Sequence, residues 1–289
     1  WHALTARNET AAAVMQALED RGGCTDLSAL RAQFPDEQAL QAALRYLLAR
    51  RLIEAGAVLL DGRPVEKPAQ EVPPGAHTLE VGESRETRYV GRGGLKLEAA
   101  LDAFPVPVAG GVFADIGAST GGFTDCLLSR GAARVYCIDA GHGQLHPRLR
   151  ADERVRCAEG VNARLLTPET LGALEPSGRN PDGSLFAGKV GGAVMDVSFI
   201  SQTLILPALA GILLPGGFLI SLVKPQFECG TAALSRHGVV TAERDRRAAV
   251  ERVTASAAAC GFTRQGLIPS PIAGGDGNRE FLAYFVRTA

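Results

Sequence analysis

The chain has 289 residues, of which 46% are hydrophobic and 21% are charged, and its formal net charge is -1. This length and composition predict a globular protein with a substantial buried core, built from one large domain and one small one. The near-neutral charge balance excludes a uniformly basic nucleic-acid-binding surface, although it leaves room for a local basic patch.

The cysteines and the longest uncharged segment bear on the compartment. Six scattered cysteines form no C-x-x-C pair with metal spacing, so we interpret them as reduced thiols of a cytoplasmic protein without a bound metal. Residues 204–223 are uncharged and about as long as a bilayer-spanning helix. Two prolines and three glycines interrupt them, which favours a helix over 200–214, a Pro-Gly-Gly turn and a buried strand over 218–223, with no membrane partner.

The first 81 residues have the pattern of a small separate module. A helix is expected to stop at Gly56, and Asp61-Gly62 indicates a hairpin turn between short strands, with a closing strand up to Val81. Residues 26–44 show a helical pattern. Residues 82–88 are polar, lack an apolar period and are typical of a linker, so a second domain is predicted over 89–289.

Short apolar runs alternate with helical patterns from Tyr89 onward. The alternation predicts an α/β fold, with a mostly parallel sheet and helices on both faces. The Gly/Pro/Ser-rich residues 176–192 are predicted to form a surface insertion. Strands are predicted over 112–116, 134–139, 155–158, 193–197, 218–223, 264–268 and 281–287, and helices over 95–103, 123–130, 201–214 and 242–260.

A glycine-rich segment, Asp115-Ile-Gly-Ala-Ser-Thr-Gly-Gly-Phe-Thr-Asp125, lies between a predicted strand and a predicted helix, as a cofactor loop does. Its spacing matches neither the dinucleotide G-x-G-x-x-G motif nor the phosphate-binding P-loop, and no lysine follows the glycines. This favours a ligand with an amino group and a ribose, such as S-adenosylmethionine. Asp115 would face the ammonium, Gly117 and Gly121 would let the backbone approach, and Asp139 would bind the ribose. The alternative is a turn that only packs the helix tightly on the strand.

Four charged residues are expected at strand ends or close to the cofactor strand. Asp196 and Lys224 each end a buried strand, Glu280 opens the last strand, and Lys96 precedes the cofactor strand. Ligands of open α/β sheets bind beyond the carboxyl ends of the strands, and a lysine there beside a carboxylate is a candidate for proton transfer. Taken singly, each residue is better explained as a solvated surface charge or as a member of a structural ion pair.

Longer motifs surround these residues. They are Arg88-Tyr-Val-Gly-Arg-Gly-Gly-Leu-Lys-Leu-Glu98, Asp115-Ile-Gly-Ala-Ser-Thr-Gly-Gly-Phe-Thr-Asp-Cys-Leu-Leu128, Asp196-Val-Ser-Phe-Ile-Ser201, Lys224-Pro-Gln-Phe-Glu228, Gly266-Leu-Ile-Pro-Ser-Pro-Ile272 and Gly277-Asn-Arg-Glu-Phe-Leu282. Over about residues 45–289, and in the same order, the sequence resembles the TlyA (hemolysin A) family of ribosomal RNA 2′-O-methyltransferases. The segment 26–44 departs from that family, because an S4 module usually opens with a short Arg-Leu-Asp helix.

The resemblance implies a Rossmann-like, seven-stranded methyltransferase sheet similar to FtsJ, behind a small N-terminal α+β module of the S4 type that binds RNA. It implies S-adenosylmethionine-dependent 2′-O-methylation of ribosomal RNA, on cytidine ribose in ribosomal subunits, without a metal. It also implies a catalytic tetrad of Lys96, Asp196, Lys224 and Glu280. Lys224, held by Asp196 and Glu280, would orient or deprotonate the 2′-hydroxyl, while Lys96 would position the hydroxyl or a neighbouring phosphate.

The complete set of expected binding residues is larger. The cofactor would be bound by Asp115, Gly117, Ser119, Gly121, Gly122, Phe123, Asp139 and Asn162. The RNA would be bound by Arg45, Arg50, Arg51, Arg63, Lys67 and Arg92, for which a solvated helix face is the alternative.

Two other functions remain to be weighed. One is a membrane-active, hemolysin-like protein, which the absence of an unbroken apolar helix opposes. The other is a non-catalytic RNA-binding protein with a vestigial methyltransferase fold, which the complete tetrad and loop residues oppose.

Overall fold

The computed structural model describes residues 30–34, 58–65, 77–81, 88–274 and 277–288. The chain divides into two compact units, residues 1–92 and residues 93–289. Most of the predicted linker lies outside the described residues, as does the predicted helix stop at Gly56.

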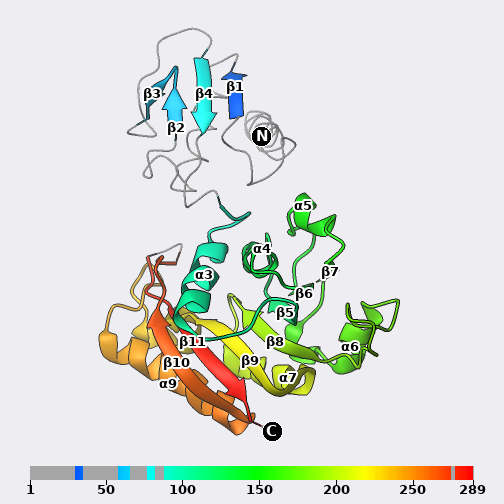
Figure 1. The fold of residues 1–289 in the computed structure, drawn as a ribbon. Helices are drawn as coiled ribbons and strands as arrows, with labels where there is room; N and C mark the ends of the chain where they lie inside the picture. The colour runs from blue at the N-terminus through cyan, green and yellow to red at the C-terminus, as the bar shows by residue number, and fades with distance from the viewer. Residues whose placement is uncertain (1–29, 35–57, 66–76, 82–87, 275–276, 289) are drawn as a thin grey trace. The chain divides into compact units, whose positions relative to one another are not determined.

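The first unit contains a four-stranded antiparallel sheet (Figure 1). The predicted hairpin is confirmed: Asp61 and Gly62 connect two strands with φ angles of 50° and 75°, the left-handed pair that a tight two-residue turn requires. In sheet order, the strands are β1 (Leu30–Phe34), β4 (His77–Val81), β2 (Val58–Leu60) and β3 (Arg63–Pro64).

Strand β1 corrects the helical pattern expected over residues 26–44. Its five residues pair antiparallel with β4, from Leu30 opposite Val81 to Phe34 opposite His77. The sequence Leu-Arg-Ala-Gln-Phe alternates apolar and polar residues with a period of two, which is a strand signal too short to stand out in an Ala- and Arg-rich region. Pairing across the sheet decided the outcome, as it often does when the local preference is weak.

The second unit is built on a seven-stranded sheet in the order β10-β11-β9-β8-β5-β6-β7 (Figure 1). Neighbouring strands are parallel from β7 to β9, and β11 runs antiparallel to both of its neighbours. The predicted fold class is therefore confirmed. The strands are β5 (Val112–Ile116), β6 (Arg134–Asp139), β7 (Val155–Glu159), β8 (Val190–Met195), β9 (Leu213–Val223), β10 (Phe262–Pro269) and β11 (Phe281–Arg287).

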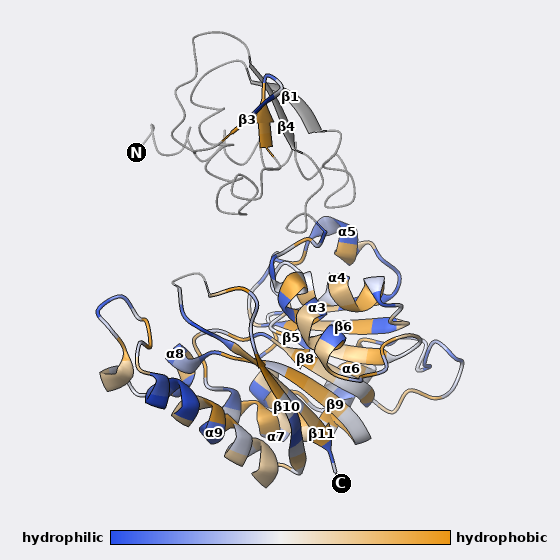
Figure 2. Ribbon diagram, turned by 60° about the vertical axis from the view of Figure 1, so that its left-hand side comes forward, coloured by the Kyte–Doolittle hydropathy of each residue, from blue (hydrophilic) through white to orange (hydrophobic). Residues whose placement is uncertain are grey.

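Helices cover both faces of this sheet. α3 (Gly93–Ala103) and α4 (Gly122–Ser129) lie on one face, and α7 (Leu206–Ile212) and α9 (Glu243–Ala259) on the other (Figure 1). Figure 2 shows the hydrophobic strands between these layers and the hydrophilic first turns of α9. Within the described residues, no helix is both long and apolar enough for a membrane crossing. The short helices are α5 (Pro147–Arg150), α6 (Pro168–Ala173), α8 (Pro225–Glu228), η3 (Ala163–Leu165), η4 (Gln202–Leu204) and η5 (Thr231–Ala233).

The hydrophobic core explains why the layers hold together. Side chains from alternate positions of the sheet pack against the buried stripes of α7 and α9, such as Leu209 and Val253. Alternation along each strand sends the remaining side chains to the opposite face. The strands at the centre of the sheet are consequently buried on both faces, and the few polar side chains inside them, such as Asp115 and Ser221, are buried.

The predicted Pro-Gly-Gly turn lies inside strand β9. Val190 of β8 pairs with Leu213, but Gly192, two residues on, pairs with Phe218. Four residues, Leu214–Gly217, therefore loop out between the paired positions, and three of them are exposed. The predicted helix over 201–214 is correspondingly shorter and divides into η4 and α7.

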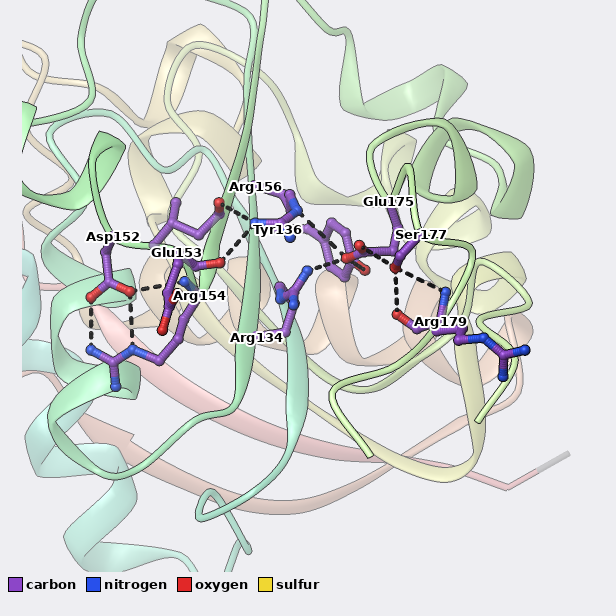
Figure 3. A network of polar contacts seen from close by, with 10 residues as sticks. Arg134, Tyr136, Asp152, Glu153, Arg154, Arg156, Glu175, Ser177 and Arg179 are labelled. Carbon is purple, nitrogen blue, oxygen red and sulfur yellow. Dashed lines mark hydrogen bonds and ion pairs between the residues drawn. The ribbon is translucent and has the colours of Figure 1, made fainter. Parts of the chain in front are cut away.

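The surface insertion predicted over 176–192 ends earlier, because strand β8 begins at Val190, and residues 176–189 are fastened to the sheet by a polar network (Figure 3). The buried carboxylate of Glu175 forms ion pairs with Arg134 of β6 and Arg156 of β7. It also accepts a hydrogen bond from Ser177 at 2.8 Å, and Phe186 stacks on the ring of Tyr136 with centroids 5.1 Å apart. The insertion thus begins and ends at fixed points of the core.

Candidate active site

The chain reverses its direction of travel across the sheet between β5 and β8. β6 and β7 are added on one side of β5, and β8 and β9 on the other. Ligands of such sheets bind at this switch point, beyond the carboxyl ends of the strands. Asp115 lies within β5, Asp139 ends β6, and Asp196 and Lys224 directly follow β8 and β9.

The glycine-rich loop connects β5 to α4 through three left-handed residues. The φ angles of Gly117, Ser119 and Gly121 are 79°, 48° and 95°, and Gly121 is the N-cap of α4. The φ of Gly121 favours glycine, and a Cβ there would also lie 2.3 Å from the side chain of Leu149. The loop is therefore a tightly packed turn, as the packing alternative required. It also borders a cavity.

That cavity has a volume of about 390 Å³, which lies within the common range for small-molecule sites. Four of the predicted cofactor-binding residues line it, namely Gly117, Ser119, Asp139 and Asn162. Asp196 lines it as well, so a predicted catalytic carboxylate and the predicted cofactor residues share one cavity. The other four predicted cofactor residues, Asp115, Gly121, Gly122 and Phe123, are not among the lining residues; all four are buried.

Asp139 and Asn162 fix the shape of the cavity wall. The Asp139 carboxylate accepts hydrogen bonds from the backbone N–H of Ser119 and of Gly141, both at 2.7 Å, which ties the glycine loop to the end of β6. The side chain of Asn162 caps η3 by accepting from the N–H of Arg164 at 3.1 Å. Both residues therefore hold backbone in place and still contribute to the cavity surface.

Asp115 occupies a different place from the one expected. It is fully buried, and its Oδ2 accepts hydrogen bonds from the N–H and the hydroxyl of Thr124 at 2.9 and 2.7 Å, which anchors the first turn of α4. Its Oδ1 has no hydrogen-bond partner among the described residues. Burial raises the pKa of Asp115 to about 7, and the nearby charges of Asp196 and Asp139 add to this rise against the Thr124 hydrogen bonds.

These observations test whether S-adenosylmethionine fits. Three carboxylates at neighbouring strand ends, one of them with a buried and unsatisfied oxygen, favour a ligand that carries positive charge. The cavity also presents apolar side chains, including Ile138, Val161 and Ile200, which suit an adenine ring. An amphipathic ligand with a sulfonium and an ammonium matches both properties, so the residues fit this cofactor.

Lys224 forms the first of two lysine–carboxylate ion pairs. Its Nζ lies 2.6 Å from Oδ1 of Asp196, at an angle that makes no hydrogen bond, and it donates to the hydroxyl of Ser198 at 2.8 Å. The Nζ also lies 5.9 Å from the centre of the Phe227 ring. The Asp196 side chain is 23% exposed, so this pair is at the edge of the cavity and accessible from it.

Lys96 and Glu280 form the second pair, which corrects one expectation. Nζ of Lys96 donates to Oε2 of Glu280 at 2.5 Å, whereas Glu280 had been expected to hold Lys224. Glu280 does lie beside Lys224 in the sheet, because Phe281 pairs with Val223 and the two residues flank that pair. The sheet therefore brings both pairs together, and the carboxylate of Glu280, only 2% exposed, turns to the other lysine.

Phe199 is a site residue that sequence reasoning missed. It has a φ of 63°, which costs a bulky residue about 1–3 kcal/mol, and it is 91% exposed although it lines the cavity. The centre of its ring lies 5.2 Å from that of Phe227, the ring over which Nζ of Lys224 lies. Ser198 was missed as well. The signal was present in the motif Asp196-Val-Ser-Phe-Ile-Ser201, of which only the aspartate received a role.

The predicted RNA-binding residues are described only in part. Arg45, Arg50, Arg51 and Lys67 lie outside the described residues. Arg63 is exposed on β3, and Arg92 is half-buried. In the described ranges, no cluster of His, Cys, Asp and Glu has the geometry of a metal site.

Comparison with known proteins identifies both units. The model of the FtsJ-like methyltransferase family matches residues 89–287, and that of the S4 domain matches residues 48–77. The 16S/23S rRNA (cytidine-2′-O)-methyltransferase TlyA of Mycobacterium tuberculosis is 42% identical over 82% of this chain and 82% of its own length. Hemolysin A of Brachyspira hyodysenteriae is 37% identical over 82% of this chain and 92% of its own length. A solved structure described as a hemolysin from Streptococcus thermophilus has 43% identity and a TM-score of 0.67, and the match covers 83% of this chain and 82% of that one.

Proposed function

Since this chain belongs to the TlyA (hemolysin A) family of FtsJ-like methyltransferases, we propose that it methylates a ribose 2′-hydroxyl of ribosomal RNA with S-adenosylmethionine as donor. The observation that carries the proposal is the Lys224–Asp196 ion pair at the edge of the cavity lined by Ser119, Asp139 and Asn162. This ion pair holds the Lys224 ammonium, which can bind a hydroxyl, beside the cavity in which the methyl donor would bind.

Each residue then has a physical task. The cofactor, when bound, supplies an activated methyl group on a positively charged sulfur. Asp139 and Asn162 would hold its nucleoside end, and the carboxylates of Asp115 and Asp196 would favour its positive charge. Lys224, fixed by Asp196 and Ser198, would orient the 2′-oxygen for in-line attack, and the proton that the hydroxyl loses would move onto this ion pair.

Lys96 and Glu280 would act beside the reacting atoms. Glu280 is nearly inaccessible, so it fixes Lys96 rather than meeting a substrate. Lys96 would position the hydroxyl or a neighbouring phosphate. The exposed ring of Phe199 offers a face on which a nucleobase can stack, an interaction worth about 1–3 kcal/mol per base.

The RNA substrate is proposed from the first unit and from the relatives. We assign residues 1–81 to an S4-like RNA-binding module and residues 89–289 to the catalytic domain, in agreement with the S4 match over 48–77. The exposed Arg63 is the described residue best placed for phosphate contact in that module. Cytidine of the ribosomal subunits is the proposed acceptor, because the M. tuberculosis relative acts on cytidine in 16S and 23S rRNA. The proposed compartment is the cytoplasm.

Transfer of a tritiated methyl group to purified ribosomal subunits tests the proposal. Label should appear in RNA at a 2′-O position, and mapping of the modified nucleotide should identify a cytidine. The proposal would be contradicted by label in the nucleobases of the RNA or in ribosomal protein. It would also be contradicted if neither subunit were labelled under conditions where the purified protein binds S-adenosylmethionine.

A further inference from the structure

Two short segments that follow neighbouring strands are joined by side-chain contacts. The first, Ser198–Gln202, follows β8 and is called the aromatic loop here because it carries the exposed Phe199. The second, Lys224–Glu228, follows β9 and contains α8. Lys224 donates a hydrogen bond to the hydroxyl of Ser198, the first residue of the aromatic loop. The centres of the Phe199 and Phe227 rings lie 5.2 Å apart.

Glu228 accepts two further hydrogen bonds that connect the two segments. Its Oε2 accepts a hydrogen bond from the hydroxyl of Ser201 at 2.6 Å, and its Oε1 accepts one from the backbone N–H of Gln202 at 2.8 Å. One carboxylate thus binds two successive residues of the aromatic loop with both of its oxygens. Hydrogen bonds to an ionised acceptor are among the stronger ones in proteins.

Glu228 is itself firmly anchored. The residue is 2% exposed, and its backbone carbonyl accepts a hydrogen bond from the guanidinium of Arg252 of α9 at 2.7 Å. Next to it, the side chain of Gln202 donates to the carbonyl of Leu222 and accepts from the hydroxyl of Ser221, both at 2.6 Å. The far end of the aromatic loop is therefore tied to β9 and α9, the elements that also carry Lys224 and the core.

The near end of the loop carries the reactive groups. Asp196, two residues before Ser198, pairs with Lys224, and Phe199 between the two ends holds a left-handed φ that a phenylalanine adopts only under constraint. With 91% of its surface exposed, Phe199 is not held in this conformation by burial. The constraint has to come from the hydrogen bonds on either side of it.

We infer that Glu228 is a positioning residue of this site, which holds the aromatic loop in register with Lys224 and so keeps Asp196 and Phe199 in place. Glu228 does not line the cavity, so it acts through the loop and not on the substrate. The inference rests on the proposed function for its effect on methyl transfer, whereas the contact with the loop can be tested without any RNA.

Three full-length variants test the inference. Glu228→Ala removes both acceptors, and Glu228→Gln keeps a carbonyl oxygen for the Gln202 amide in a side chain of nearly the same shape. Glu251→Ala is the matched control, because it removes a carboxylate from α9 whose side chain is 60% exposed and pairs with Arg264 on the surface. Amide hydrogen exchange, affinity for S-adenosylhomocysteine, and the kcat and KM of methyl transfer are measured for each.

In Glu228→Ala, the amides of the aromatic loop should exchange at least tenfold faster, while amides of the neighbouring strands β5 and β8 keep their protection. The kcat should fall about 10- to 100-fold, and affinity for S-adenosylhomocysteine should fall less, because Asp139 and Ser119 remain in place. Glu228→Gln should restore loop protection and most of kcat, and Glu251→Ala should match the wild type.

Two results would overturn the inference. One is unchanged exchange at Gln202 in Glu228→Ala. The other is an equal loss of protection throughout the sheet, with Glu228→Gln as inactive as Glu228→Ala, since that would show a general loss of stability. A wild-type protein that methylates no RNA would reject the proposed function and leave the exchange result to decide on Glu228.

Discussion

The two lysine–carboxylate pairs of the catalytic unit have the same composition but different surroundings. The two lysine side chains are equally shielded, each 11% exposed. Their carboxylates differ, because Asp196 borders the cavity with 23% of its side chain exposed, whereas Glu280 is 2% exposed. The comparison teaches that an ion pair near a site is not catalytic by composition alone. On accessibility we propose that the Lys224–Asp196 pair takes part in the reaction and that Glu280 supports Lys96.

Replacement of Lys224 tests the accessible pair and should have the largest effect. Lys224→Ala should lower the rate of methyl transfer by about 10²–10⁴-fold, the usual contribution of a group that handles a proton or orients a nucleophile. Calorimetry should show nearly unchanged affinity for S-adenosylmethionine, because Lys224 does not line the cavity. If Lys224→Ala retained the wild-type rate of methyl transfer, Lys224 would have no part in the reaction, and accessibility would not distinguish the two ion pairs.

Replacement of Glu280 tests the buried pair. Glu280→Ala leaves the Lys96 ammonium without its partner in a shielded place, so the free energy of unfolding should fall by about 3–5 kcal/mol. Asp196→Ala should lower it by less, because Asp196 is partly solvated and Lys224 keeps its hydrogen bond to Ser198. Urea unfolding of both variants measures the contrast.

A double variant then separates support from chemistry. Lys96→Met combined with Glu280→Gln removes both charges, so it should recover most of the lost stability. If methyl transfer recovers with it, Lys96 has no role beyond structure and the tetrad reduces to the accessible pair. If the protein is stable but slow, Lys96 takes part in positioning the substrate.

Asp115 extends the comparison to a third carboxylate, whose effect on stability depends on pH. An aspartate ionises near a pKa of about 3.9 in an unfolded chain, whereas burial raises the pKa of Asp115 to about 7. A carboxyl group with a raised folded-state pKa stabilises the folded protein fully below about pH 4, and this contribution is lost as the pH rises towards 7. Asp115→Asn keeps an oxygen for Thr124 and does not titrate.

Between pH 4 and pH 8, the free energy of unfolding of the wild type should therefore fall, relative to Asp115→Asn, by about 4 kcal/mol. Urea unfolding without cofactor at several pH values checks this, with Asp102→Asn as an exposed control whose side chain is 60% accessible. Parallel curves for wild type and Asp115→Asn would mean that the carboxyl group ionises normally despite its burial. The asparagine variant should also bind S-adenosylmethionine less tightly at pH 8.

Strong periodic signals made much of the catalytic unit predictable. Strands β5, β6 and β11 begin and end at the predicted residues, because each is a run of apolar residues bounded by turn residues and charges. Strand β1 was missed because only five residues alternate, and the hydrogen bonds that stabilise it come from β4, far along the chain. Local sequence does not contain that information.

The candidate site was predictable in its members but not in its contacts. Asp196, Lys224, Lys96 and Glu280 were found because they stand at the ends of strands or in family motifs. Glu280 forms its ion pair with Lys96 and not with Lys224 because of the directions of the side chains after β9 and before β11. No rule of sequence spacing specifies these directions. Glu228 and Phe199 went unassigned for a similar reason, since the meaning of a buried acceptor or a left-handed phenylalanine appears only once the two segments are in contact.

The close approach of Gly117 to Asp196 has a consequence for the design of altered donors. A Cβ at Gly117 would come within 2.4 Å of the backbone oxygen of Asp196, so the glycine turn and the segment after β8 touch without intervening atoms. Under the proposed function, an enzyme remodelled to transfer groups larger than methyl cannot gain room by changes in the glycine turn, since any added atom there displaces the backbone of Asp196, whose carboxylate pairs with Lys224. Smaller side chains at Val197 or Ile200, which line the cavity, would widen it and leave the turn intact.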